Sequence, residues 1–200
     1  MQKQAYHHGD LANALIKATV SLLATKGAAT LSLREIARVA GVSHGAPAHH
    51  FGDKSGLLTA VATKGQGLLG EALLESQINI PSAGMRLNKA GQVYVRFAIE
   101  QPAFFSIMFE TELINPLDNE YIASCAIPRS VLTTCIRDVA GKKKLNARQV
   151  NASLARLWSL VHGFSVLWLS GNFGDPDDLE LLDSILFDML NLKNLKSWTR

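Results

Sequence analysis

Apolar residues recur every three or four positions along most of the chain, which is the spacing that places them on one face of an α-helix. The pattern predicts four helices before a break at residues 79–84: 10–26, 32–40, 43–51, and one that begins at 53. Further helices are predicted over about 83–101, 103–111, 118–140, 146–171 and 177–196. No segment shows the alternation typical of a strand, so the sequence predicts an all-α fold.

Helix start and stop signals define the first segments. Ser32 and Glu35 have the spacing of a capping box, and Gly41 is placed to end that helix in the left-handed conformation. Ser43 is expected to cap the short third helix, as Asp10 is for the first, and Asp53 begins the fourth.

The second and third predicted helices are separated by only two residues. Ala37 is small enough to let the two helices approach, and Gly41 provides the tight turn between them. Gly45 and Pro47 fall in the first turn of the third helix, where a missing N–H group costs least. These features together predict a helix-turn-helix.

The charge is unevenly distributed. The net charge is +3, and residues 1–60 hold six basic and three acidic side chains, while the remaining 140 residues hold 14 of each. Five of the six histidines also lie within the first 50 residues. This distribution favours an anionic partner for the N-terminal third.

Histidines at positions 44, 49 and 50 raise the alternative of a metal site. Two histidines chelate from one helical face when they are three or four residues apart, but His44 and His49 are five apart and His49 and His50 are adjacent. DNA contact and packing against backbone groups are the other interpretations, and the second stays open for His50. The chain also has no GxSxG, HExxH or phosphate-loop motif, so we expect no enzyme, metal or cofactor.

No secretory signal is visible in the N-terminal residues, and the most apolar run, 157–171, is short for a membrane span and contains His162. Cys125 and Cys135 are about 15 Å apart if they lie on one helix, too far for a disulfide. A cytoplasmic protein without a membrane partner is therefore expected.

The segment "LSLREIARVAGVSHGAPAHHFGDKSGLL" resembles the DNA-binding part of the Tet repressor family, over about residues 9–60. "YHHGDL" near the N-terminus and "LWSLVHG", with Trp158, His162 and Gly163, resemble the subgroup that has a Trp-His-Gly signature in its C-terminal domain. The resemblance implies a homodimeric repressor that binds a palindromic double-stranded DNA operator and dissociates when a small effector binds. It also implies a DNA-binding domain at residues 1–55 and an effector-binding and dimerisation domain at 56–200.

The family pattern assigns DNA contacts to Ser32, Arg34, Ser43, His44, Gly45, Ala46, Ala48, His49, His50 and Lys54. Arginine makes the commonest specific contact to a base, so Arg34 is a candidate for base readout, although a solvated side chain explains it as well. One position departs from the family: Ala48 stands where a tyrosine usually contacts a phosphate. This departure keeps open a helical interaction module that has lost DNA binding, besides a helical metal sensor or enzyme.

The C-terminal part is less informative. The resemblance implies an effector pocket, for which we expect Tyr94, Phe97, Phe104, Met108, Trp158 and His162; ordinary core packing explains most of them equally well. The last two helices have long apolar faces that are expected to pair across a two-fold axis. The predicted interface residues are Leu154, Leu157, Trp158 and Val161 on one helix, and Leu179, Leu182, Ile185, Leu186 and Met189 on the other.

Overall fold

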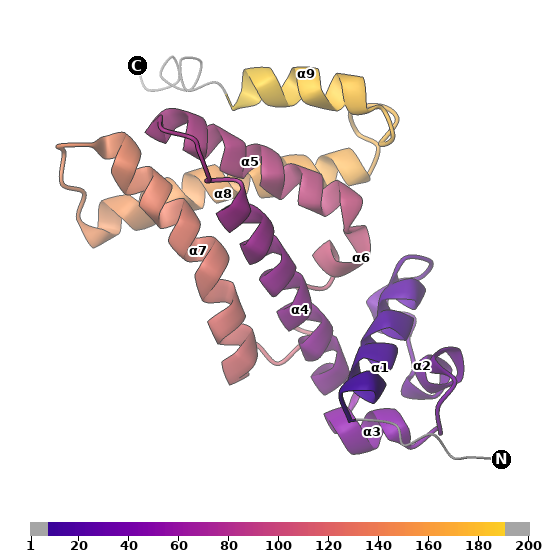
Figure 1. The fold of residues 1–200 in the computed structure, drawn as a ribbon. Coiled ribbons are helices and arrows are strands. Elements are labelled where there is room, and N and C mark those ends of the chain that lie inside the picture. Colours follow the sequence, from indigo (N-terminus) through magenta and orange to yellow (C-terminus); the bar gives the residue numbers. More distant parts are fainter. Residues whose placement is uncertain (1–7, 191–200) are drawn as a thin grey trace. The chain divides into compact units, whose positions relative to one another are not determined.

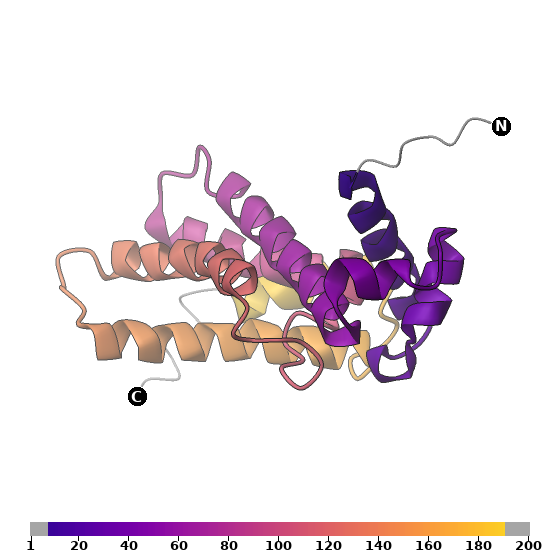
Figure 2. The ribbon, with the colours of Figure 1, turned by 90° about the horizontal axis from the view of Figure 1, so that it is seen from below.

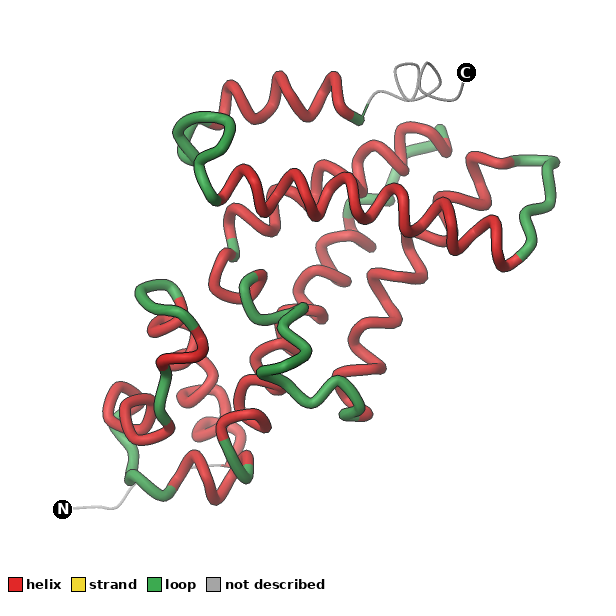
Figure 3. The backbone as a smooth tube through the Cα atoms, turned by 180° about the vertical axis from the view of Figure 1, so that it is seen from behind, coloured by secondary structure: helices red, strands yellow, loops and turns green. Residues whose placement is uncertain are grey.

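The computed structural model describes residues 8–190, and these are helical and contain no strand, as Figure 3 shows. The predicted all-α class is confirmed. The helices are α1 (His8–Leu23), α2 (Leu33–Ala40), α3 (Ala46–Phe51), α4 (Lys54–Glu75), α5 (Ala83–Glu100), α6 (Pro102–Phe105), α7 (Asn119–Ala140), α8 (Ala147–Leu169) and α9 (Leu179–Met189), with a short 3₁₀ helix, η1, at Ala28–Thr30. The side chain of Asp10 and residues 191–196 of the last predicted helix lie outside the described residues.

Most predicted boundaries agree with the structure within about two residues, but the helix predicted over 103–111 does not. Only α6 is helical there, and turns follow it to residue 113. Pro102 occupies the first turn of α6, where its missing N–H group needs no partner.

The chain forms two compact units. The first contains residues up to Gly67 together with Gln101–Cys125, and the second contains Leu68–Glu100 and the residues from Ala126 onward. Both long helices α4 and α7 therefore contribute to both units. The first unit is larger than the predicted DNA-binding segment of residues 1–55.

Within the first unit, α1, α2 and α3 gather beside the beginning of α4 (Figure 1). Their apolar faces meet in a core of fully buried side chains that includes Leu15, Ile36, Ala37, Leu57 and Leu58. Thr19 is also buried, and its hydroxyl donates to the Leu15 carbonyl oxygen at 2.8 Å. This core fixes the positions of α2 and α3.

Within the second unit, α5 lies along α8, and the part of α7 after Cys125 is connected to α8 by the loop of residues 141–146 (Figure 2). Asn146 begins α8 with a complete capping box, in which its side chain and that of Gln149 bond each other's backbone N–H groups. None of the described helices is long and apolar enough to cross a membrane.

Candidate nucleic-acid interface and apolar pocket

The turn between α2 and α3 has the geometry predicted from Gly41. Gly41 has φ 69°, and the N–H groups of Gly41 and Val42 donate to the carbonyl oxygens of Arg38 and Ala37 at 3.3 and 3.0 Å. This pair of bonds is a Schellman motif, which ends α2 and redirects the chain within two residues.

At the start of α2, only half of the predicted capping box forms. The Ser32 hydroxyl accepts from the Glu35 backbone N–H at 3.2 Å. The Glu35 carboxylate does not return to Ser32, because it binds the Lys26 ammonium at 2.6 Å. An ion pair with a cation replaces the second capping bond.

Helix α3 begins later than predicted, and Ser43 does not cap it. Its first residue is Ala46, and Gly45, which has no side chain that could cap, precedes it. A backbone hydrogen bond begins the helix instead, since the Ser43 carbonyl oxygen accepts from Ala46 N–H at 3.0 Å. Pro47 is buried in the first turn and holds α3 to the rest of the unit.

Most of the residues predicted to contact DNA are accessible to solvent. Eight are exposed, and the other two, Ala46 and Lys54, are half-buried. The exposed residues are Ser32, Arg34, Ser43, His44, Gly45, Ala48, His49 and His50. His50 is therefore not a buried core residue, although its ring contacts Phe51 edge-on with centroids 4.6 Å apart.

Lys54 lies at the start of α4, and its ammonium donates to the Ala29 carbonyl oxygen at 2.8 Å. An ammonium group has three N–H donors, so this bond orients the charge and still leaves donors for a phosphate. The Asp53 carboxylate caps α4 by accepting from Gly56 N–H at 2.8 Å. Glu35 and Asp53 thus have cationic or N–H partners within the unit.

Gly56 permits a close contact between α3 and α4. A Cβ atom at this position would lie 2.0 Å from the carbonyl oxygen of Phe51, the last residue of α3. No side chain fits there. The sequence motif "GDKSGLL" therefore contains a glycine on which the placement of α3 depends.

In the second unit, three predicted ligand-binding residues form a hydrogen-bonded group. The Trp158 indole N–H donates to the Tyr94 hydroxyl at 3.0 Å, and the same hydroxyl lies 2.9 Å from His162 Nδ1. Burial lowers the pKa of His162, so the imidazole is neutral at pH 7, and burial raises the pKa of the Tyr94 phenol far above its ordinary value. Because Tyr94 accepts from Trp158, its own proton is directed to Nδ1 and the histidine proton is assigned to Nε2.

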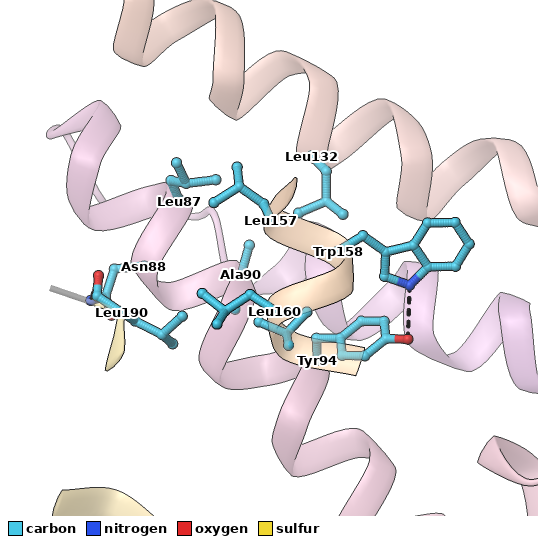
Figure 4. Close-up of a pocket in the computed structure, with 11 residues that line it drawn as sticks. Leu87, Asn88, Ala90, Tyr94, Leu132, Leu157, Trp158, Leu160 and Leu190 are labelled. Atoms are coloured by element: carbon cyan, nitrogen blue, oxygen red, sulfur yellow. Dashed lines mark hydrogen bonds between the residues drawn. The ribbon is translucent and has the colours of Figure 1, made fainter. Parts of the chain in front are cut away.

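An apolar pocket lies next to this group, between α5, α7 and α8 (Figure 4). Tyr94 and Trp158 line one end, and Asn88 and Leu190 line the other. The cavity volume is about 30 Å³, enough for a single water molecule. None of its lining residues carries a charge: Leu87, Asn88, Ala90, Gly91, Tyr94, Leu132, Leu157, Trp158, Leu160, Val161 and Leu190.

The remaining predicted ligand-binding residues do not line this pocket. Phe104 and Met108 are core residues of the first unit, where both pack against Gly65. Phe97 is buried on α5 and borders a different surface hollow, together with Ala72 and Val93. These aromatic and flexible apolar side chains pack in the core of the protomer. Their spacing in the sequence does not distinguish core residues from residues that line a pocket.

Four of the residues predicted for the dimer interface are core residues of the protomer: Leu154, Val161, Leu182 and Leu186. A side chain already buried within one chain offers little surface to another, so these four positions stay predictions that the burial does not favour. Trp158 and Leu179 are exposed by 39% and 49%, and Leu157, Ile185 and Met189 are half-buried.

The sequence reasoning missed Asn88 and Leu190 at the pocket, and it missed three exposed apolar side chains, Val166, Leu167 and Phe187. A signal was present for Phe187, because its spacing places it on the same face of α9 as the polar residues Glu180, Asp183 and Ser184. No group of three or more histidine, cysteine, aspartate or glutamate side chains within residues 8–190 could hold a metal ion. Cys125 and Cys135 are both free thiols.

Comparison with family models gives two matches. Residues 15–61 match "Bacterial regulatory proteins, tetR family", and residues 87–190 match "Tetracyclin repressor-like, C-terminal domain". Comparison with curated protein sequences gives no match.

Solved structures with the same fold cover nearly the whole chain. A protein of unknown function from Rhodococcus sp. RHA1 is 25% identical with a TM-score of 0.73, over 94% of this chain and 97% of that one. The fatty acid degradation regulator FadR from Bacillus halodurans is 14% identical with a TM-score of 0.72, over 96% and 98%. A tetR-family transcriptional regulator from Streptomyces coelicolor is 21% identical with a TM-score of 0.65, over 90% and 79%.

The C-terminal model alone spans more than half of the chain, and the N-terminal model covers the helix-turn-helix whose geometry is described above. The protein belongs to the Tet repressor family of DNA-binding transcriptional regulators.

Proposed function

We propose that the protein is a repressor that binds a pseudo-palindromic DNA duplex as a homodimer and dissociates when a small effector binds within residues 56–200. The observation that carries the DNA-binding part is the exposed surface of α3 and the turn before it, held in place by Gly41, Pro47 and Gly56. Residues 1–55 would contain every DNA contact. Trp158, His162 and Gly163 support assignment to the Trp-His-Gly subgroup.

The side chains at this surface support a duplex DNA partner. Arg34 lies in the first turn of α2 and is exposed, as are the histidines of α3. Arginine binds guanine through two hydrogen bonds, whereas lysine and backbone N–H groups position a protein on the phosphates. We assign base readout to Arg34 and His44, and phosphate contact to Lys54.

The dimer is proposed to form through the exposed faces of α8 and α9, not through the faces predicted from periodicity. Gly163 has open space where a Cβ would lie, and Ser159 and Val166, one turn away on either side, are exposed. Phe187 on α9 is 68% exposed and is available for contact with a second copy.

The charges at the two ends of α8 support an antiparallel pairing. Exposed cations, Lys142, Lys143, Lys144 and Arg148, lie at its beginning, and exposed carboxylates, Asp175, Asp177, Asp178 and Glu180, follow its end. Figure 1 shows these two loops at opposite ends of the helix. A two-fold axis across the middle of α8 would place each basic end beside the acidic end of the second copy.

Selection of bound fragments from a pool of random duplexes tests the proposal. The expected result is a pseudo-palindromic consensus bound by a dimer, with log affinity falling by about 0.9 per phosphate contact for each unit of log salt. Arg34→Ala should cost ~1–3 kcal/mol on the consensus and little on random DNA. Lys89→Ala removes an exposed cation from α5, a helix that the proposal places neither on DNA nor in the dimer, and should change neither affinity. A pool without any consensus would refute the repressor proposal.

A further inference from the structure

Leu190 occupies one end of the apolar pocket. It follows α9 directly and is 6% exposed. Its two terminal methyl groups lie against the backbone of α5 at Gly91, where an added Cβ would be 3.0 Å from both. The absence of a side chain at Gly91 thus creates the space that the leucine fills.

The backbone of Leu190 is bound as well as its side chain. The Asn88 amide nitrogen donates to the Leu190 carbonyl oxygen at 3.0 Å, and the Asn88 amide oxygen accepts from Gln92 Nε2 at 2.9 Å. The bond from Gln92 fixes which way the amide points, so its N–H faces the pocket end. Helix α5 therefore receives a branched aliphatic group and an adjacent carbonyl oxygen together.

We infer that Leu190 occupies a ligand site, and that the site accepts small uncharged molecules in which a branched aliphatic group adjoins a carbonyl. The remaining cavity of about 30 Å³ is too small for an effector, since ligand pockets measure ~300–1,000 Å³. A ligand would consequently enter by taking the place of the leucine, with its carbonyl on Asn88 and its aliphatic part over Gly91.

The lining excludes charged ligands. No lining side chain carries a charge, and moving a carboxylate into such a site without a cation costs far more than moving an amide that keeps a hydrogen bond. A neutral amide, ester or ketone is therefore favoured over a carboxylate of the same shape. Only the role of the bound molecule as an effector rests on the proposed function. The binding site itself can be tested without DNA.

Isovaleramide and isovalerate provide a matched pair of probes, because they have the same shape and differ in charge. Titration of each into the full chain by calorimetry or protein-observed NMR should show binding of the amide only. Leu190→Ala should bind isovaleramide at least about tenfold more tightly than the unchanged protein, because the ligand no longer competes with the leucine side chain for the space over Gly91. Asn88→Leu in the Leu190→Ala background should weaken that binding about tenfold.

Leu74→Ala is the matched control, since it makes the same truncation at a leucine that is exposed on α4 and does not line the pocket. It should leave isovaleramide binding unchanged. Leu190→Val, which removes one methylene, should also tighten binding, by a smaller factor. It replaces the alanine variant in the test if that variant does not fold. Equal binding of isovalerate, or equal affinities of the unchanged protein and both Leu190 variants, would overturn the inference. Those results would leave DNA binding intact, whereas loss of a DNA consensus with retained amide binding would overturn only the proposed function.

Discussion

Replacement of Gly56 by alanine tests how α3 is positioned. The added Cβ would lie 2.0 Å from the Phe51 carbonyl oxygen, whereas Cβ atoms in proteins essentially never approach a heavy atom closer than 3.0 Å. The end of α3 and the first turn of α4 must therefore separate by about 1 Å. Both partners are backbone atoms or are fixed to backbone, so no side-chain rotation relieves the contact.

The cost follows from what the separation disrupts. Gly56 N–H also donates to the capping Asp53 carboxylate at 2.8 Å, so movement of the first turn weakens the start of α4. Forced overpacking costs ~1–3 kcal/mol, and loss of a helix cap adds ~1 kcal/mol. We expect Gly56→Ala to lower the free energy of unfolding by about 2–4 kcal/mol.

Gly67→Ala is the matched control, because Gly67 lies on the same helix and nothing is within 4 Å of its added Cβ. Alanine there should raise the free energy of unfolding by ~0.5–1 kcal/mol through helix propensity. Chemical unfolding followed by circular dichroism measures both, and titration with the selected duplex reports on α3. If Gly56→Ala were as stable as Gly67→Ala and bound DNA equally well, the close contact between α3 and α4 would not exist in solution.

Two further predictions concern DNA and the dimer. Ala48 is exposed, so a tyrosine fits there without a clash inside the protomer. Titration should show that Ala48→Tyr strengthens binding by ~0.5–1.5 kcal/mol on preferred and random duplexes alike. Weaker binding with an intact fold would mean that α3 docks differently from the family pattern. Reversal of charge at Lys143 and Lys144 to glutamate should weaken the dimer about tenfold in sedimentation equilibrium, and adding Asp177→Lys and Glu180→Lys should restore it. Failure of the second pair to rescue the first would exclude the antiparallel pairing.

The helix-turn-helix could be predicted from the sequence because its signals are local. Gly41 is needed for a left-handed turn, Asp53 caps the helix that follows, and Pro47 suits a first turn. Each acts on residues three or four positions away, so none depends on the rest of the fold. Two predicted caps did not form. The Ser43 carbonyl oxygen, not its hydroxyl, accepts from Ala46 N–H, and Glu35 binds Lys26 in place of the Ser32 backbone.

The pocket and the interface could not be predicted in the same way. Periodicity shows that one face of α8 is apolar, but it does not show whether that face meets α5 or a second copy. Leu154 and Val161 are buried within the protomer, while Val166 and Leu167 on the same helix remain exposed. Likewise, Phe104 and Met108 resembled pocket residues because core and pocket use the same side chains.

Helix α9 connects the proposed dimer contact with the proposed ligand site. Its buried side chains, Leu182 and Leu186, hold it within the second unit, and Phe187 points away from them toward the proposed partner. Leu190 follows directly and is held by Asn88 at the pocket. A ligand that displaced Leu190 would remove an anchor at the end of the helix that presents Phe187. Because Leu190 directly follows the helix that bears Phe187, ligand binding and dimer geometry would be coupled. By reciprocity, DNA that favours one dimer geometry would change the affinity for the ligand by the same factor.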